Sequence, residues 1–101
     1  MEVKEIKKDR RMKIDTEDGA VLLTYIIKVK MVINGKELEI IKTLTQQLIF
    51  DYDSEEATKQ LASIEHEIYE LERKADKWIN DTKEILIGLE QIAENHGYKI
   101  I

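Results

Sequence analysis

The chain has 101 residues, 37% of them charged and 43% hydrophobic, with a net charge of −5, four Gly, no Pro and no Cys. This length fits one domain with a modest core. The absence of cysteine excludes a disulfide scaffold, a thiolate zinc site and a Cys nucleophile. The first residues are charged where a signal peptide is apolar, and no apolar stretch is long enough to span a bilayer. We therefore predict a soluble cytoplasmic protein that does not engage a membrane.

Charge is distributed unevenly along the chain. Residues 1–13 carry a net charge of +3, residues 14–50 a net charge of −1, and residues 51–101 a net charge of −7. A basic N-terminal segment therefore precedes an acidic C-terminal half, and each is a candidate binding surface.

The first half of the chain carries the pattern of an antiparallel sheet. Every second residue of the segment 20–33 is apolar, which predicts a strand with one buried face. Asn34-Gly35 follows and favours a two-residue type I′ turn. That turn places Lys30 opposite Glu39, an opposite-charge cross-strand pair.

Asp18-Gly19 is a second turn signal. A two-residue hairpin at this point sets Ile14 against Leu23. It also sets Met12 against Tyr25, so that all four side chains share the core face. We therefore predict a three-stranded antiparallel meander at residues 10–49, with strands at 10–16, 20–33 and 36–49, after a basic N-terminal arm at residues 1–9.

Apolar residues in the acidic half recur at alternating spacings of four and three, the heptad pattern of a helix that packs along a seam. The seam positions are Ala57, Leu61, Ile64, Ile68, Leu71, Ala75, Trp78, Thr82, Ile85, Leu89 and Ile92. Asp53 or Ser54 is suited to cap the start of the helix, and Gly97 is suited to the left-handed position after its end. We therefore predict helix over residues 54–96.

Asn80-Asp81-Thr82 is the weak point of this helix, because all three residues are poor helix formers. The segment is one long or bent helix, or a helical hairpin broken there; the unbroken heptad phase favours continuity. Residues 97–101 then form a C-terminal tail or an edge strand. The fold class is α+β, a meander followed by a long C-terminal helix.

The seam changes width along the helix. It is narrow up to Ala75 and widens from Trp78 onward, where Ile79, Leu86 and Ala93 join it. A narrow stripe suits a helix–helix contact, and a wide one suits a helix on a sheet. We therefore expect the second half to cover the sheet and the first half to meet another helix, in a homodimer or higher oligomer. The predicted dimer seam is Ala57, Leu61, Ile64, Ile68, Leu71, Ala75 and Trp78.

The sequence contains no recognisable catalytic constellation. Ser54 suits a helix cap, and Ser63 lies within the helix without a Gly-rich elbow. His66 and Glu70 have an i, i+4 spacing that can bind a metal ion, but no third ligand accompanies them. The four isolated glycines form no phosphate-binding loop. We therefore predict that the protein is not an enzyme and has no metal site and no cofactor.

Two charged sets remain as candidate binding surfaces. The acidic helix residues, which suit a basic partner protein, are Glu55, Glu56, Glu65, Glu67, Glu70, Glu72 and Asp76. The basic residues, which suit the phosphates of a nucleic acid, are Lys7, Lys8, Arg10, Arg11, Lys13, Lys28 and Lys30. A pI near 5.1 and a shortage of aromatic side chains weigh against nucleic acid.

In size, composition and lack of catalytic equipment the chain resembles the small accessory proteins of phages and other mobile elements, a resemblance that rests on no motif. Many of those proteins bind a host protein or sequester a ligand. We therefore predict a small non-enzymatic, homo-oligomeric binding protein of this type, which inhibits or modulates a host protein or sequesters a ligand. The alternative is a nucleic-acid-binding regulatory protein that uses the basic N-terminal strand and the sheet face.

Overall fold

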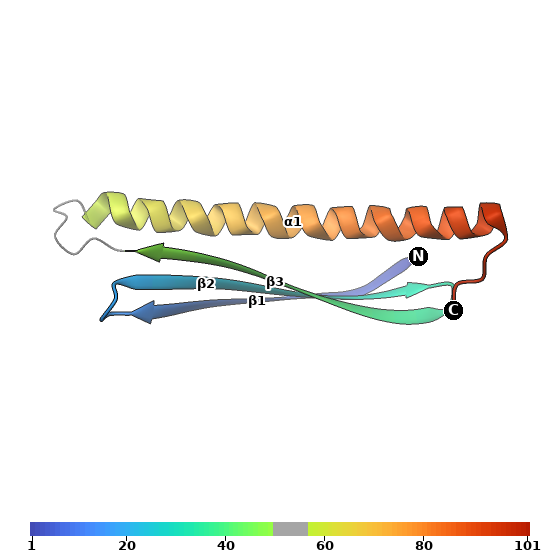
Figure 1. The fold of residues 1–101 in the computed structure, drawn as a ribbon, viewed down its shortest axis with the longest axis horizontal. Helices are drawn as coiled ribbons and strands as arrows, with labels where there is room; N and C mark the ends of the chain where they lie inside the picture. Colours follow the sequence, from blue (N-terminus) through green and yellow to red (C-terminus); the bar gives the residue numbers. More distant parts are fainter. Residues whose placement is uncertain (50–56) are drawn as a thin grey trace.

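The computed structural model describes residues 1–49 and 57–101, which form three strands and one helix (Figure 1). The elements are β1 (Glu2–Asp15), β2 (Ala20–Ile33), β3 (Lys36–Ile49) and α1 (Ala57–His96). The sheet is antiparallel, with the strand order β1-β2-β3. This architecture confirms the predicted α+β fold. The predicted helix start at Asp53 or Ser54 lies outside the described residues.

The hairpin between β2 and β3 has the predicted register. Asn34 and Gly35 both adopt positive φ angles, 51° and 77°, as a type I′ turn requires. Lys30 pairs with Glu39 across the two strands. Local turn chemistry and the alternating pattern therefore agree in this half of the sheet.

The register of the hairpin between β1 and β2 differs from the prediction by two residues. Met12 lies opposite Leu23 and Ile14 opposite Val21, because the connection at residues 16–19 has four residues rather than two. One oxygen of Asp15 accepts hydrogen bonds from the backbone N–H groups of residues 17 and 18, at 3.0 and 3.2 Å, which stabilises the longer loop. A shift of two residues keeps every side chain on its predicted face. Leu23 and Tyr25 are buried in the core as predicted, but Met12 and Ile14 are 50% and 60% exposed, because the helix does not cover this end of β1, so their predicted place in the core is wrong.

β1 begins at Glu2, eight residues before the predicted start of the first strand, so residues 1–9 do not form a separate arm. The cause is the length of β2, whose 14 residues offer hydrogen-bonding partners along the whole of β1. The ladder is interrupted once, by a bulge between Val3 and Glu5.

α1 is one continuous helix of 40 residues that passes through the weak point at 80–82. Ala75, Ile79 and Leu86 are buried on both sides of that point, so packing on the sheet overrides the poor local propensity. The helix ends in a Schellman motif: Gly97 has φ 72°, and the Tyr98 N–H donates to the carbonyl of Ala93 at 2.8 Å. The following tail forms no strand and turns back towards the sheet (Figure 1).

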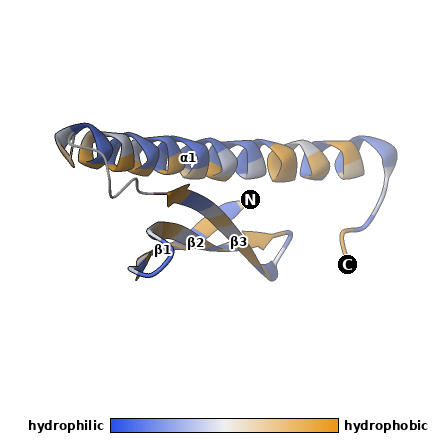
Figure 2. Ribbon diagram, turned by 60° about the vertical axis from the view of Figure 1, so that its left-hand side comes forward, coloured by the Kyte–Doolittle hydropathy of each residue, from blue (hydrophilic) through white to orange (hydrophobic). Residues whose placement is uncertain are grey.

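α1 lies along one face of the sheet over most of its length (Figures 1 and 2). The core is formed by the alternate residues of β2 and by one stripe of the helix. These buried residues are Val21, Leu23, Tyr25, Ile27, Val29, Met31, Ile33, Leu71, Ala75, Ile79 and Leu86. Because one helix covers the sheet, the core is thin and the molecule is a rod of 64 × 18 × 18 Å. No helix among the described residues is both long and apolar enough to cross a membrane.

Candidate functional site

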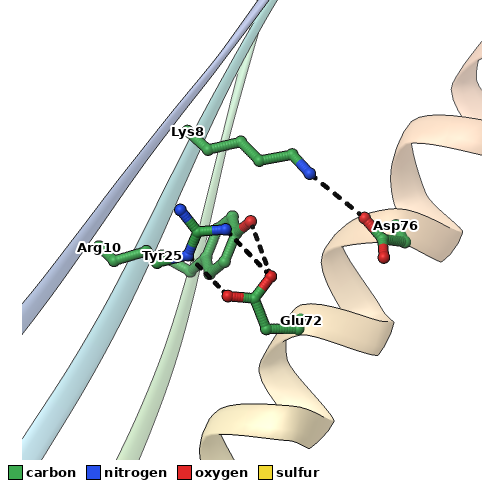
Figure 3. Close-up of polar contacts among 5 residues, drawn as sticks. All are labelled: Lys8, Arg10, Tyr25, Glu72 and Asp76. Atoms are coloured by element: carbon green, nitrogen blue, oxygen red, sulfur yellow. Dashed lines mark hydrogen bonds and ion pairs between the residues drawn. The ribbon is translucent and has the colours of Figure 1, made fainter.

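The most elaborate polar contact among the described residues joins β1 to α1 beside the core (Figure 3). The guanidinium of Arg10 binds the carboxylate of Glu72 through two parallel hydrogen bonds. Its Nε donates to Oε1 at 2.6 Å and its Nη2 donates to Oε2 at 3.2 Å. Such a bidentate pair fixes direction as well as distance. The contact therefore sets the position of α1 relative to the β1 edge.

Tyr25 of β2 is the third member of this cluster (Figure 3). Its hydroxyl donates to Oε2 of Glu72 at 3.2 Å, while its ring is buried in the core, as predicted. The Arg10 guanidinium carbon lies 4.9 Å from the centroid of the same ring, within the range of a cation–π contact. Tyr25 therefore connects the hydrophobic core, through its ring, to the Arg10–Glu72 ion pair, through its hydroxyl.

The three groups shift one another's pKa in directions that favour the ion pair. The hydrogen bonds from Arg10, with a smaller contribution from Tyr25, lower the pKa of Glu72 below its ordinary value. The same bond to Glu72 raises the pKa of Arg10. Burial, and then the charge of Glu72, raise the pKa of Tyr25, so its phenol stays protonated.

A second ion pair extends the cluster towards the C-terminus of α1. Lys8 Nζ lies 3.4 Å from Oδ1 of Asp76 (Figure 3). Lys8 and Arg10 belong to the predicted basic surface, and Glu72 and Asp76 belong to the predicted acidic surface. The fold therefore pairs parts of the two candidate surfaces with each other.

The remaining acidic candidates do not form one face. Glu55 and Glu56 lie outside the described residues. At about 100° per residue, Glu65 points to the same side as Glu72, whereas Glu67 and Glu70 lie on other sides of the helix. Glu70 is 3.4 Å from Arg73, one turn away on the same helix.

The basic candidates are divided between the two faces of the sheet. Lys8 and Arg10 point to the helix side. The others share the outer face: Lys7, Arg11, Lys13, Lys28 and Lys30. Lys7 pairs with Glu5 at 3.5 Å and Arg11 with Asp9 at 2.8 Å, so neighbouring acids offset part of this charge.

The residues of the predicted dimer seam lie at different depths in the single chain. Leu71 and Ala75 are buried against the sheet, and Ile64, Ile68 and Trp78 are half-buried. Ala57 and Leu61 are exposed. The expected division of the helix therefore differs from the observed one, because the middle of α1, rather than its second half alone, covers the sheet.

The cavity next to Tyr25 is small. It is bounded by Met12, Ile68 and Leu71 and has a volume of about 170 Å³. Pockets for drug-sized ligands usually measure about 300–1,000 Å³. Within residues 1–49 and 57–101, no three His, Asp or Glu side chains are grouped so that they could hold a metal ion.

Sequence reasoning missed the Arg10–Glu72–Tyr25 cluster. The signal for it was the register of the first hairpin: the observed register places Arg10 directly opposite Tyr25, whereas the predicted one placed Met12 there. Comparison of the chain with protein-family models, with curated proteins and with solved structures finds no match.

Proposed function

We propose that the protein is a small non-enzymatic binding protein that works as a homo-oligomer. The observation that carries this proposal is its surface area. The chain exposes 7633 Å², whereas a compact monomer of 11.9 kDa exposes about 6,000 Å². The excess follows from the rod shape, and large apolar side chains of the strands, of α1 and of the C-terminal tail remain in solvent. Extended apolar surface of this kind is typical of protein–protein contact.

The chemistry of the polar cluster supports binding over catalysis. A catalytic base or nucleophile needs a free lone pair or an ionisation near neutral pH. Glu72 instead accepts three hydrogen bonds through its carboxylate oxygens, and its pKa is lowered rather than raised. Tyr25 has a raised pKa and donates its proton to Glu72. These groups fit the role of a structural clamp.

Sedimentation velocity of the purified chain over a wide concentration range tests the proposal. We expect a species of twice 11.9 kDa, or a larger multiple, that dissociates on dilution. A protein that sediments at 11.9 kDa at every concentration would contradict homo-oligomerisation.

A second candidate function, nucleic-acid binding, has one observation in its favour. Lys7 and Lys28 lie directly opposite each other on the outer face, with Arg11 nearby. Like charges in this arrangement destabilise a sheet, and a phosphate group between them would relieve the repulsion. Lys28→Glu replaces this like-charge pair by an opposite-charge pair with Lys7, and is the variant that tests phosphate binding at this position.

A gel-shift series at rising salt separates this candidate from the first. Nucleic-acid binding predicts a shift at low salt that Lys28→Glu abolishes. No shift by the native chain at low salt would remove the candidate.

A further inference from the structure

α1 carries two apolar stripes that diverge along its length. The first comprises Leu71, Ala75, Ile79 and Leu86, which are buried on the sheet. The second, here named the α1 strip, comprises Trp78, Ile85, Leu89 and Ile92. It lies about 90° around the helix from Leu86. Figure 2 shows hydrophobic colour on the sheet-facing side of α1 and, in the C-terminal half, beyond it.

The divergence follows from the period of the sequence pattern. A straight helix of 3.6 residues per turn drifts by about 20° per heptad relative to a strict 3.5-residue seam. The seam therefore faces the sheet near Leu71 and turns away from it towards Ile92. Covering a sheet requires only the first stripe, so the heptad spacing of the second needs another explanation.

The α1 strip lies on the β3 side of the molecule, where Trp78 is half-buried against the core and the other three residues are exposed. Ile85, Leu89 and Ile92 are 62%, 49% and 57% exposed. Leu89 and Ile92 line a groove with Leu38 of β3 and with residues 98–101 of the C-terminal tail. The opposite flank of α1 is the one joined to β1 by the Arg10–Glu72 and Lys8–Asp76 pairs. One flank is therefore joined to β1 by ion pairs. The other is apolar, is bordered by β3 and the C-terminal tail, and is exposed at Ile85, Leu89 and Ile92.

The exposed area of the whole chain, to which its rod shape contributes, leaves room for one interface of standard size. The chain exposes roughly 1,600 Å² more than a compact monomer of its mass. A standard protein–protein interface buries about 800 Å² on each partner. One contact of standard size along the α1 strip would bring each chain closer to the exposure expected for its mass.

The chemistry of the α1 strip suits a second copy of the same chain. Heptad spacing allows the side chains of two identical helices to interdigitate. Asp81, the charged residue beside the strip between Trp78 and Ile92, is neutralised by Lys77 at 3.0 Å, so like charge does not oppose self-pairing. Gly88 lies next to Ile85 and Ile92 on the helix surface, and a methyl group built there would meet nothing else within 4 Å. The packing of the single chain does not require glycine at this position, whereas the close approach of another helix favours it.

We propose that two copies associate through the α1 strip, with the helices antiparallel and the two-fold axis near Ile85. This inference rests on the proposed homo-oligomeric function and specifies its interface. The arrangement places Trp78 of each copy near Ile92 of the other. It differs from the predicted dimer seam, which runs from Ala57 to Trp78 and shares only Trp78 with the α1 strip.

Sedimentation velocity of matched variants tests the proposal. Ile85→Lys places a charge in the α1 strip, and Ile87→Lys places the same charge two residues away on the opposite flank of the helix, where Ile87 is 45% exposed. We expect Ile85→Lys to raise the dissociation constant of the dimer by at least about tenfold, because two lysines enter an apolar contact. Ile87→Lys should leave the constant unchanged, and both variants should keep the native circular dichroism spectrum.

Ile92→Lys and the native tryptophan provide independent readouts. Ile92→Lys should act like Ile85→Lys. Trp78 is the single tryptophan of the chain, so its emission should shift to longer wavelength as the native protein is diluted. A dimer that withstands both substitutions in the strip would overturn this interface while leaving homo-oligomerisation intact. A native chain that is monomeric at all concentrations would overturn both proposals. This holds even if the α1 strip binds a different protein.

Discussion

Replacing Glu72 with glutamine tests the clamp between sheet and helix. Glu72→Gln removes the charge that accepts two bonds from Arg10, at 2.6 and 3.2 Å, and one from Tyr25 at 3.2 Å. Hydrogen bonds to charged groups contribute about 1.5–3 kcal/mol, whereas exposed ion pairs contribute about 0–1 kcal/mol. The Glu72 side chain is 31% exposed, which places it between these limits. We expect the free energy of unfolding at pH 7 to fall by about 1–1.5 kcal/mol.

The loss should depend on pH in a defined direction. The pKa of Glu72 is lower in the folded chain than its ordinary value of 4.5. Its charge therefore stabilises the fold above pH 4.5, and this stabilisation is lost as the pH falls through the folded pKa. The difference between native chain and Glu72→Gln should be full at pH 7 and absent at strongly acidic pH.

Urea denaturation followed by circular dichroism, at one fixed protein concentration, measures both effects. Glu70→Gln is the matched control, because Glu70 is 32% exposed but makes a single 3.4 Å contact, to Arg73. That variant should lose only about 0.3–0.5 kcal/mol. Equal losses for the two variants, or a loss for Glu72→Gln that persists in acid, would refute the clamp.

Three further substitutions test the packing and the turns, each by the same urea titration. Ile79→Ala should cost about 2–4 kcal/mol, because Ile79 is buried on the sheet stripe; a cost below about 1 kcal/mol would contradict its place in the core. Gly35→Ala should cost about 1–2 kcal/mol, since φ at this position is 77°, and a neutral effect would contradict the type I′ turn. Asp15→Ala should cost about 0.5–1 kcal/mol by removing the acceptor of two loop N–H groups, and no loss would show that water replaces it.

The parts of the fold that sequence predicts well are those fixed by local chemistry. Asn34-Gly35 specifies a turn of one length, and the Lys30–Glu39 pair agrees with it, so the β2–β3 register follows. Asp18-Gly19 suits a longer loop as well, and the side chain of Asp15 selects the four-residue form. That choice cannot be derived from alternation, because a shift of two residues leaves the faces unchanged.

The candidate site was less predictable because it depends on two alignments at once. The contact between Arg10 and Glu72 can be predicted only when both the register of β1 and the rotation of α1 about its axis are known. The heptad pattern indicated the helix correctly, but it described two stripes as one: the drift between 3.5 and 3.6 residues per turn turns the seam by about 60° over the three heptads from Leu71, which faces the sheet, to Ile92, which does not. The predicted relation to phage or mobile-element accessory proteins rests on composition and stays a prediction.

The distance between two identical spin labels tests the central claim, that two copies meet antiparallel along the α1 strip. The chain has no cysteine, so Asn95→Cys supplies a single thiol for the label at an exposed, uncharged position of α1 away from the α1 strip, and it leaves the Lys77–Asp81 pair intact. With the two-fold axis near Ile85, the labelled positions lie about 30 Å apart along the helix axes. Adding the spacing of packed helices, we expect a pulsed electron resonance distance of about 30–40 Å. A distance of about 10–20 Å, as parallel helices would give, or the absence of any dipolar coupling would contradict the account.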